Sequence, residues 1–181
     1  NNVHIGVSIL STSKTIMYEV MTLAEDLGID MYYTDTDSIH IDNSKIGYLG
    51  QEFQKKYGRE LIGKQMGQFH TDFDLKGSVG DIVASASIIL GKKCYIDKLS
   101  GKDKDGNELT DYHIRMKGVS TSCIEFKGDQ EYKGDYMKMF EELYKGNTLE
   151  FNLLAVSPSF ELCKNMNIKS RKQFKRRISF K

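Results

Sequence analysis

Two aspartates separated by one residue are the part of this sequence with the most specific chemistry. Asp35 and Asp37 lie within the stretch 31–42, between two runs of β-prone residues. Side chains at positions i and i+2 of a strand or tight hairpin share a face, so we expect the two carboxylates to lie close together. Two like charges at that distance are costly unless a cation lies beside them. Mg²⁺ suits such hard oxygen ligands, and it usually takes one or two carboxylates plus substrate phosphates.

The same spacing also fits a surface β-hairpin with aspartate in its turn. The residues that flank the acids are apolar or aromatic on both sides: Ile29, Met31, Tyr32, Tyr33, Ile39 and Ile41. This flanking pattern favours a hairpin whose strands lie in a core and whose turn presents the acids. The combination predicts the protein half of a two-metal phosphoryl-transfer site.

The segment that begins at Tyr33 reads Tyr-x-Asp-Thr-Asp-Ser, and it resembles the palm-domain metal motif of family B DNA polymerases. The resemblance implies that Asp37 binds both catalytic Mg²⁺ ions and that Asp35 assists beside them. It also implies that Tyr33 lies next to the incoming nucleotide and the primer end. Thr36 and Ser38 belong to the same predicted nucleotide- and primer-binding set.

A second motif of that family, Lys-x-Tyr on a strand that contacts the primer, is similar to Lys93-Cys94-Tyr95. The resemblance implies that Lys93 pairs with a phosphate as a point charge and that Tyr95 lies against the sugar–phosphate backbone. Lys117, at the end of the next predicted strand, resembles a further basic primer-binding position of the protein-primed branch. The residues after Gly118 resemble the small thumb of that branch, which grips the duplex product.

Two further family motifs are absent from the sequence. Asp-x-x-Ser-Leu-Tyr-Pro supplies the other metal-binding aspartate, and Lys-x-x-x-Asn-Ser-x-Tyr-Gly holds the triphosphate. The resemblance therefore covers the chain as the C-terminal part of such an enzyme, and a start at Asn1 without Met favours a fragment or a processed product. For the intact enzyme it implies template-directed transfer of deoxynucleotides to a primer 3′-hydroxyl. The implied partners are primer–template DNA, dNTP and a terminal priming protein. We expect the isolated chain to be inactive.

Charge is unevenly distributed along the chain. Residues 161–181 contain eight basic residues and one acid, net +7, whereas residues 1–160 contain 18 basic and 24 acidic residues, net −6. A basic end on an acidic body indicates a polyanion as the partner of that end, and a solvated or disordered tail is the alternative. The DNA-binding residues predicted in the tail are Arg171, Lys172, Lys175, Arg176 and Arg177.

Composition places the chain among globular proteins. It has 181 residues, of which 39% are hydrophobic and 28% charged, enough for one domain with a small appendage. No apolar run approaches the roughly eighteen residues of a membrane span, so we expect no membrane partner. Cys94, Cys123 and Cys163 form no CxxC pair, which favours an intracellular, reducing compartment. The resemblance adds a viral, plasmid or organellar replication setting.

Hydrophobic periodicity predicts an α+β fold. We expect an antiparallel palm sheet with helices packed on one face over residues 1–118, followed by a small α+β thumb over residues 119–181. The predicted helices cover residues 11–27, with a cap at Ser11, Thr12 or Ser13, and residues 45–57 and 135–144. The predicted strands are a hairpin over 29–42, then 68–75, two segments around Gly91 within 81–99, and 109–117, 148–155 and 176–181.

Other interpretations remain open. His70, Asp72 and Asp74 fit a metal site, although alternating polar residues on a half-exposed strand explain them equally well. The acidic loop at 103–106 resembles a calcium loop, but the glycine and glutamate of an EF-hand are missing at their required positions, and a hairpin turn fits better. The alternative functions are a non-catalytic nucleic-acid-binding module that uses the basic tail, and another palm-type enzyme such as a nucleotidyl cyclase or reverse transcriptase. The Thr36 spacer argues against a reverse transcriptase, whose motif is Tyr-x-Asp-Asp.

Overall fold

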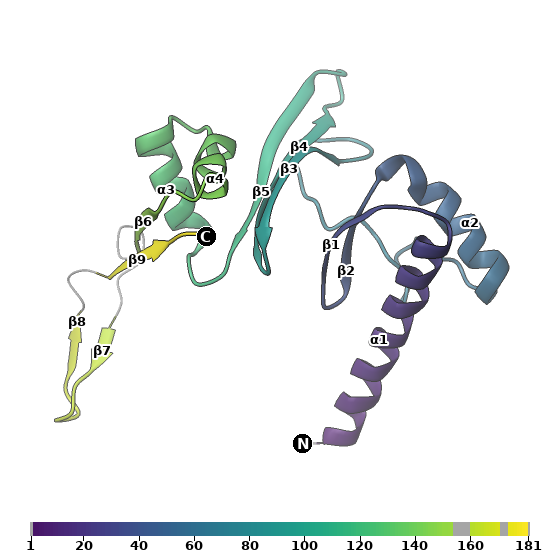
Figure 1. The fold of residues 1–181 in the computed structure, drawn as a ribbon, viewed down its shortest axis with the longest axis horizontal. Coiled ribbons are helices and arrows are strands. Elements are labelled where there is room, and N and C mark those ends of the chain that lie inside the picture. Colours follow the sequence, from purple (N-terminus) through teal and green to yellow (C-terminus); the bar gives the residue numbers. More distant parts are fainter. Residues whose placement is uncertain (1, 154–159, 171–173, 181) are drawn as a thin grey trace. The chain divides into compact units, whose positions relative to one another are not determined.

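The computed structural model describes residues 2–153, 160–170 and 174–180. The chain divides into two compact units, Asn1–Asp72 and Phe73–Lys181 (Figure 1). The described residues form four α-helices and several antiparallel sheets, so the predicted α+β class is confirmed. The predicted palm–thumb boundary at residue 118 falls inside the second unit and stays a prediction. Among the described helices, none combines the length and apolar character needed to cross a membrane.

The first unit consists of a two-stranded hairpin and the helices before and after it. Its elements are α1 (Val3–Asp26), β1 (Met31–Asp35), β2 (Ser38–Ile41), the 3₁₀ turn η1 (Asn43–Lys45) and α2 (Ile46–Tyr57). The core of the unit is formed by Val20, Leu23, Ala24, Ile29, Leu49, Phe53 and Leu61. Met31, Ile39 and Ile41 of the hairpin pack against this core, so the helices support the strands that carry the acids.

Helix α1 begins at Val3, well before the predicted start at residue 11. The hydroxyls of Ser8, Thr12 and Thr15 each donate to the main-chain carbonyl oxygen four residues earlier, at 3.0 Å. A hydroxyl that bonds back within a helix does not terminate it, so the predicted cap Thr12 is an interior residue instead, and Ser11 and Ser13 lie inside the helix beside it. The helix stops where predicted, because Gly28 takes the left-handed conformation with φ 65°.

Two further predictions for the first unit have different outcomes. Helix α2 matches its predicted range and ends at Gly58, again left-handed with φ 68°. The predicted strand over 68–75 is wrong, because the described residues there form only an isolated bridge between Ile62 and Phe69. The N–H of Phe69 donates to the carbonyl of Leu61 at 2.8 Å, so this segment folds back on its own neighbour and adds no strand to a sheet.

The second unit is built on a three-stranded antiparallel sheet in the order β3–β4–β5. The strands are β3 (Val83–Gly91), β4 (Cys94–Lys102) and β5 (Glu108–Met116), close to the predicted ranges. In the turn between β4 and β5, Asp103 Oδ1 accepts hydrogen bonds from the N–H groups of Asp105 and Asn107, and Gly106 is left-handed. This carboxylate is used inside an Asx-type turn, in agreement with a hairpin.

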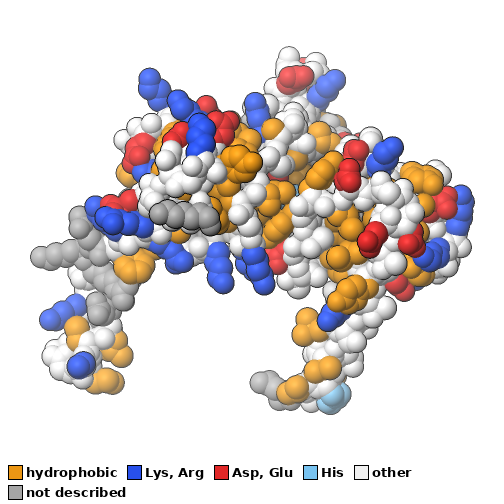
Figure 2. Space-filling model, viewed as in Figure 1, with side chains coloured by type: hydrophobic (Ala, Val, Ile, Leu, Met, Phe, Trp, Pro, Cys, Tyr) orange, Lys and Arg blue, Asp and Glu red, His pale blue; other side chains and the backbone are white. Residues whose placement is uncertain are grey.

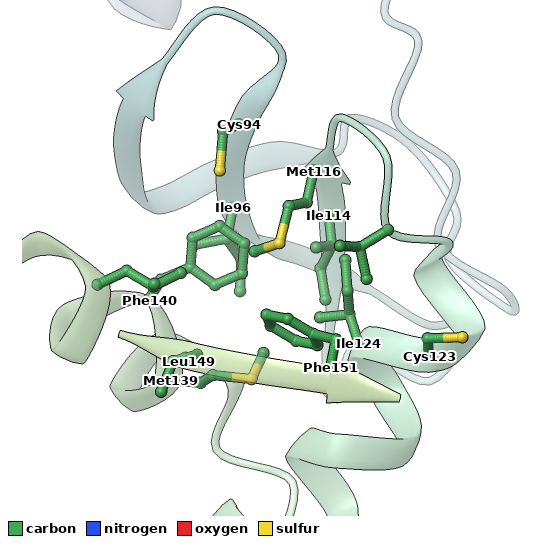
Figure 3. Packing of buried hydrophobic residues seen from close by; sticks show 12 residues of the cluster. Cys94, Ile96, Ile114, Met116, Cys123, Ile124, Met139, Phe140, Leu149 and Phe151 are labelled. Carbon is green, nitrogen blue, oxygen red and sulfur yellow. The ribbon is translucent and has the colours of Figure 1, made fainter. Parts of the chain in front are cut away.

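One face of the sheet carries the main hydrophobic core of the second unit. Helices α3 (Thr121–Tyr132) and α4 (Tyr136–Tyr144) and strand β6 (Leu149–Asn152) contribute to it. Its residues are Cys94, Ile96, Ile114, Met116, Val119, Cys123, Ile124, Met139, Phe140, Leu143, Leu149 and Phe151. Figure 3 shows side chains from β4 and β5 directed toward those of α3, α4 and β6. The same face of each strand therefore packs on the helices, as alternation requires.

The C-terminal part of the second unit forms two small sheets. The predicted strands near 148–155 and 176–181 correspond to β6 and β9 (Lys175–Ile178), which pair antiparallel. Strands β7 (Phe160–Leu162) and β8 (Ile168–Ser170) form a further hairpin that the sequence did not predict.

Helix α3 was not predicted from the sequence either. Its surface is mostly polar, and close packing of α4 depends on Gly128, where a Cβ would lie 2.3 Å from the Tyr136 ring.

Candidate functional site

The acidic motif lies at the tip of a two-stranded antiparallel hairpin, as predicted. Strand β1 ends at Asp35, β2 begins at Ser38, and Thr36 and Asp37 form the two-residue loop. Asp37 therefore lies in the loop and not on a strand, so strand alternation does not determine the direction of its side chain. The tight turn itself brings the two aspartates together, since the Asp37 N–H donates to the Asp35 carbonyl at 2.6 Å.

A β-bulge in β1 separates the hairpin side chains into two sets. Tyr33 pairs with His40, whereas Met31 pairs with Ile41, and the register shifts between Met31 and Tyr33. Cross-strand partners share a face, so the bulge turns Met31 toward the core and leaves Tyr33 and Asp35 together on the opposite face. Sequence reasoning missed His40, whose ring meets Tyr33 edge to face with centroids 5.4 Å apart. Counting pairs outward from a two-residue loop would have found it.

The loop holds a strained residue between the two acids. Thr36 has φ 50°, a left-handed conformation that is rare for a β-branched residue and costs about 1–2 kcal/mol. Its hydroxyl donates to Asp35 Oδ1 at 3.2 Å, and the Ser38 hydroxyl donates to the Asp35 main-chain carbonyl at 3.1 Å. Asn-Gly, the pair favoured in two-residue hairpin loops, would adopt a positive φ without this backbone strain. Strain of this kind clusters at functional sites, which makes the loop a candidate on physical grounds.

The two carboxylates provide the donor set that Mg²⁺ uses when phosphates complete its ligand shell. Asp37 is exposed and Asp35 is half-buried. Within the part of the chain that the structure describes, no group of three or more His, Cys, Asp or Glu side chains comes together. The described residues thus form no closed, all-protein metal site. Two carboxylates at one hairpin tip, of which Asp37 is exposed, fit a cation that is shared with a substrate.

The Lys-x-Tyr motif lies in the second unit, where β3 turns into β4. Lys93 is exposed in the turn and left-handed, with φ 58°. Tyr95, on β4, is only 8% exposed, and its ring centroid lies 5.7 Å from that of His113. The tyrosine ring is therefore fixed by packing rather than presented on the surface. Its predicted contact with a sugar–phosphate backbone stays a prediction.

A buried polar network lies two residues along β4 from Tyr95, and the sequence analysis did not find it. Asp97 is fully buried. Ser87 Oγ donates to Asp97 Oδ1 at 2.7 Å, and His113 Nδ1 lies 3.2 Å from Asp97 Oδ2. The three residues are direct cross-strand partners on β3, β4 and β5, so the sheet register assembles the network. A buried carboxylate needs such hydrogen bonds to offset its desolvation.

Three of the predicted phosphate-binding residues come together at one end of the three-stranded sheet. The Lys117 N–H donates to the Lys93 carbonyl at 2.8 Å, which joins the loop after β5 to the β3–β4 turn. Arg176 Nη1, from β9, donates to the carbonyl of Gly118 at 3.3 Å. We call Lys93, Lys117 and Arg176 the basic corner. Figure 2 shows Lys and Arg side chains, in blue, protruding along the lower edge of the molecule in the middle of the view.

The rest of the predicted tail cluster has a different environment. Lys175 Nζ lies 2.7 Å from Glu150 Oε1, and Arg177 Nε lies 3.1 Å from Glu150 Oε2. The hydrogen bonds from Lys175 and then Arg177 lower the pKa of the Glu150 carboxyl. Exposed ion pairs of this kind are weak, so both cations remain able to meet a polyanion, but Glu150 compensates part of their charge. Arg171 and Lys172 lie outside the described residues.

The alternative metal site at His70, Asp72 and Asp74 gains no support from local structure. All three residues lie in irregular backbone rather than on the strand that would align them. In the described ranges they belong to no group of potential ligands.

No model of a known protein family and no curated protein matches this sequence.

Proposed function

We propose that the chain is the C-terminal palm-and-thumb part of a DNA-directed DNA polymerase that resembles the protein-primed branch of family B. The observation that carries the proposal is the sequence Tyr-x-Asp-Thr-Asp-Ser on a two-residue hairpin loop whose central Thr36 is left-handed. A left-handed β-branched residue is uncommon, and backbone strain of this kind clusters at functional sites. The bulge that groups Tyr33 with Asp35 on one face adds support, because bulges often re-aim side chains beside active sites.

In the intact enzyme, the primer 3′-hydroxyl loses its proton to solvent and attacks the α-phosphate of a deoxynucleoside triphosphate, and the α–β phosphate bond breaks to release pyrophosphate. Catalysis consists mostly of positioning and electrostatics. Asp37 and Asp35 would hold two Mg²⁺ ions, which when bound stabilise the attacking and leaving oxygens. Tyr33 shares a hairpin face with Asp35 and would lie beside the incoming nucleotide. Thr36 and Ser38 would keep the loop in shape through their hydrogen bonds to Asp35.

The second unit would hold the nucleic acid. Lys93, Lys117 and the basic tail would contact phosphates, and Tyr95 would lie near the sugar–phosphate backbone from its packed position on β4. Phosphate contacts are independent of sequence and weaken as salt rises. We expect the chain by itself to bind Mg²⁺ weakly and to incorporate no nucleotide, since the resemblance assigns another metal-binding aspartate to a motif that this sequence lacks. A terminal priming protein, a reducing compartment and a viral, plasmid or organellar replication setting belong to the same proposal.

Primer extension tests the proposal. The assay needs a polypeptide in which these 181 residues are joined to the segment that supplies the remaining metal-binding aspartate. Asp37→Asn should abolish Mg²⁺-dependent extension and leave duplex binding intact. Asp30→Asn, which removes an exposed acid just before β1, is the matched control and should retain activity. Equal activity of the two variants would refute the proposal.

A non-catalytic nucleic-acid-binding module is the second candidate, and the basic corner favours it independently of the acids. It predicts that Asp37→Asn changes nothing, whereas neutralising the basic corner removes duplex binding. The same pair of assays therefore separates the two functions.

A further inference from the structure

Arg176 differs from the other described cations of the tail in what it contacts. Strand β9 pairs with β6 so that Arg176 lies opposite Phe151 and Arg177 lies opposite Glu150. Cross-strand partners share a face, so Lys175 and Arg177 meet Glu150 while Arg176 lies on the other side of the ribbon. That side brings it to the loop after β5.

Gly118 allows this approach. Its φ of 82° is left-handed, and a Cβ added there would lie 2.1 Å from Arg176 Nη1. The colliding atoms belong to the end of a flexible side chain, so a methyl group at position 118 would push the guanidinium away, and the left-handed φ adds a backbone strain of its own. Glycine is thus the residue that lets Arg176 rest over the carbonyl of Gly118, 3.3 Å away.

The contact leaves most of the guanidinium available. An arginine carries five N–H donors in a planar fork, and one of them is used on Gly118. The side chain of Arg176 is exposed, as are those of Lys93 and Lys117. The backbone bond between Lys117 and Lys93 fixes the two lysines on adjacent segments. Three positive charges from three segments that are tied together form a natural position for one anion, and an arginine fork matches the geometry of phosphate oxygens.

From this geometry we infer that Lys93, Lys117 and Arg176 form a single phosphodiester-binding site, in which Gly118 positions the Arg176 guanidinium. The inference rests on the proposed function for the class of ligand, which is the backbone of duplex DNA. Through Arg176, the thumb-like tail would contact the DNA backbone next to the Lys-x-Tyr motif. The neighbouring Lys175 and Arg177 have a lesser role, because Glu150 compensates them.

The first test compares neighbouring cations on one strand. Binding of the chain to a fluorescent primer–template duplex is followed by anisotropy over a range of NaCl concentrations. Arg176→Gln should weaken binding about tenfold and reduce the slope of log K against log salt by about 1, the value for one lost phosphate contact. Lys175→Gln is the matched control, and its loss should be clearly smaller.

The second test isolates the role of Gly118. Gly118→Ala should weaken binding to a similar extent as Arg176→Gln, and combining the two should add little, because both remove the same contact. Gly106→Ala is the control for backbone strain: Gly106 has φ 84°, and a Cβ there meets nothing within 4 Å. It should bind DNA as wild type does. Thermal unfolding of each variant verifies that the fold is retained.

Equal losses for Arg176→Gln and Lys175→Gln would overturn the inference, because they would mean diffuse attraction by the whole tail. Additive losses for Gly118→Ala and Arg176→Gln would also overturn it. So would a wild-type chain that does not bind duplex DNA. The proposed function fails separately, through unchanged primer extension by Asp37→Asn, so the two failures can be told apart.

Discussion

Replacing Asp97 by alanine should destabilise the second unit more than any exposed acid does. In the described residues, Asp97 is the only polar side chain of the buried set. Its removal leaves Ser87 and His113 without their acceptor. Ser87 is exposed and can turn to water, whereas the His113 side chain is only 17% exposed and has little access to it. The main cost is therefore one unsatisfied buried donor, about 1–3 kcal/mol, plus about 1 kcal/mol for the space left behind.

The expected loss in the free energy of unfolding is thus about 2–4 kcal/mol, and urea unfolding measures it. At about 4 °C per kcal/mol for a unit of roughly this size, the Tm should fall by about 8–16 °C. Asp97→Asn keeps an acceptor of the same shape and should cost about half as much. Asp105→Ala, in the exposed turn between β4 and β5, should stay within about 0.5 kcal/mol of wild type. A loss below about 1 kcal/mol for Asp97→Ala would refute the conclusion that this network is desolvated.

Three further predictions concern the hairpin loop, a buried thiol and the tail. Thr36→Gly should raise the free energy of unfolding, measured in urea, by up to about 1.5 kcal/mol, because it removes about 1–2 kcal/mol of left-handed cost and adds about 0.5–1 kcal/mol of chain entropy. Primer extension by the joined polypeptide should fall at the same time, and a destabilised variant would contradict the assignment of strain. Burial raises the pKa of the Cys94 thiol from 9.0 to about 11. As pH rises, the thiol ionises in the unfolded chain before it does so in the folded chain, so the free energy of unfolding should drop between about pH 9 and about pH 11. Urea unfolding at several pH values measures this drop. An equal drop in Cys94→Ala would exclude the thiol as its cause. Glu150→Gln should release Lys175 and Arg177 and strengthen duplex binding by about threefold in the anisotropy assay, whereas unchanged affinity would show that Glu150 does not restrain them.

The hairpin with its two acids could be predicted because the information is local. Alternating apolar residues, a short polar loop and Gly28 before the strands determine the element and its turn. The bulge between Met31 and Tyr33 could not be predicted, since it depends on the packing of Met31 against the helices. The start of α1 was misplaced because serine and threonine fit both a cap and a helix interior, and only the hydrogen bonds decide between them.

The basic corner, in contrast to the hairpin, depends on long-range contacts that the sequence does not reveal. Lys93, Lys117 and Arg176 were each predicted to bind nucleic acid, but their meeting depends on contacts between distant segments, such as Arg176 with Gly118. The pairing of Lys175 with Glu150 is equally long-range, and it divides a tail that looks uniform in the sequence. Charge composition predicted that the C-terminal tail is positively charged, whereas the tertiary structure determines which of its charges lie together.

The proposed function depends most on divalent-cation binding at the loop of Thr36 and Asp37. Mn²⁺ titration of the isotopically labelled chain, followed by NMR line broadening, tests that claim directly. Weak binding at millimolar metal is expected, and it should disappear in Asp37→Asn. The backbone signals that should broaden first are those of Asp35, Thr36, Asp37 and Ser38. Broadening that centres on another acidic segment, such as the Asp103 turn, or that persists unchanged in Asp37→Asn, would contradict it.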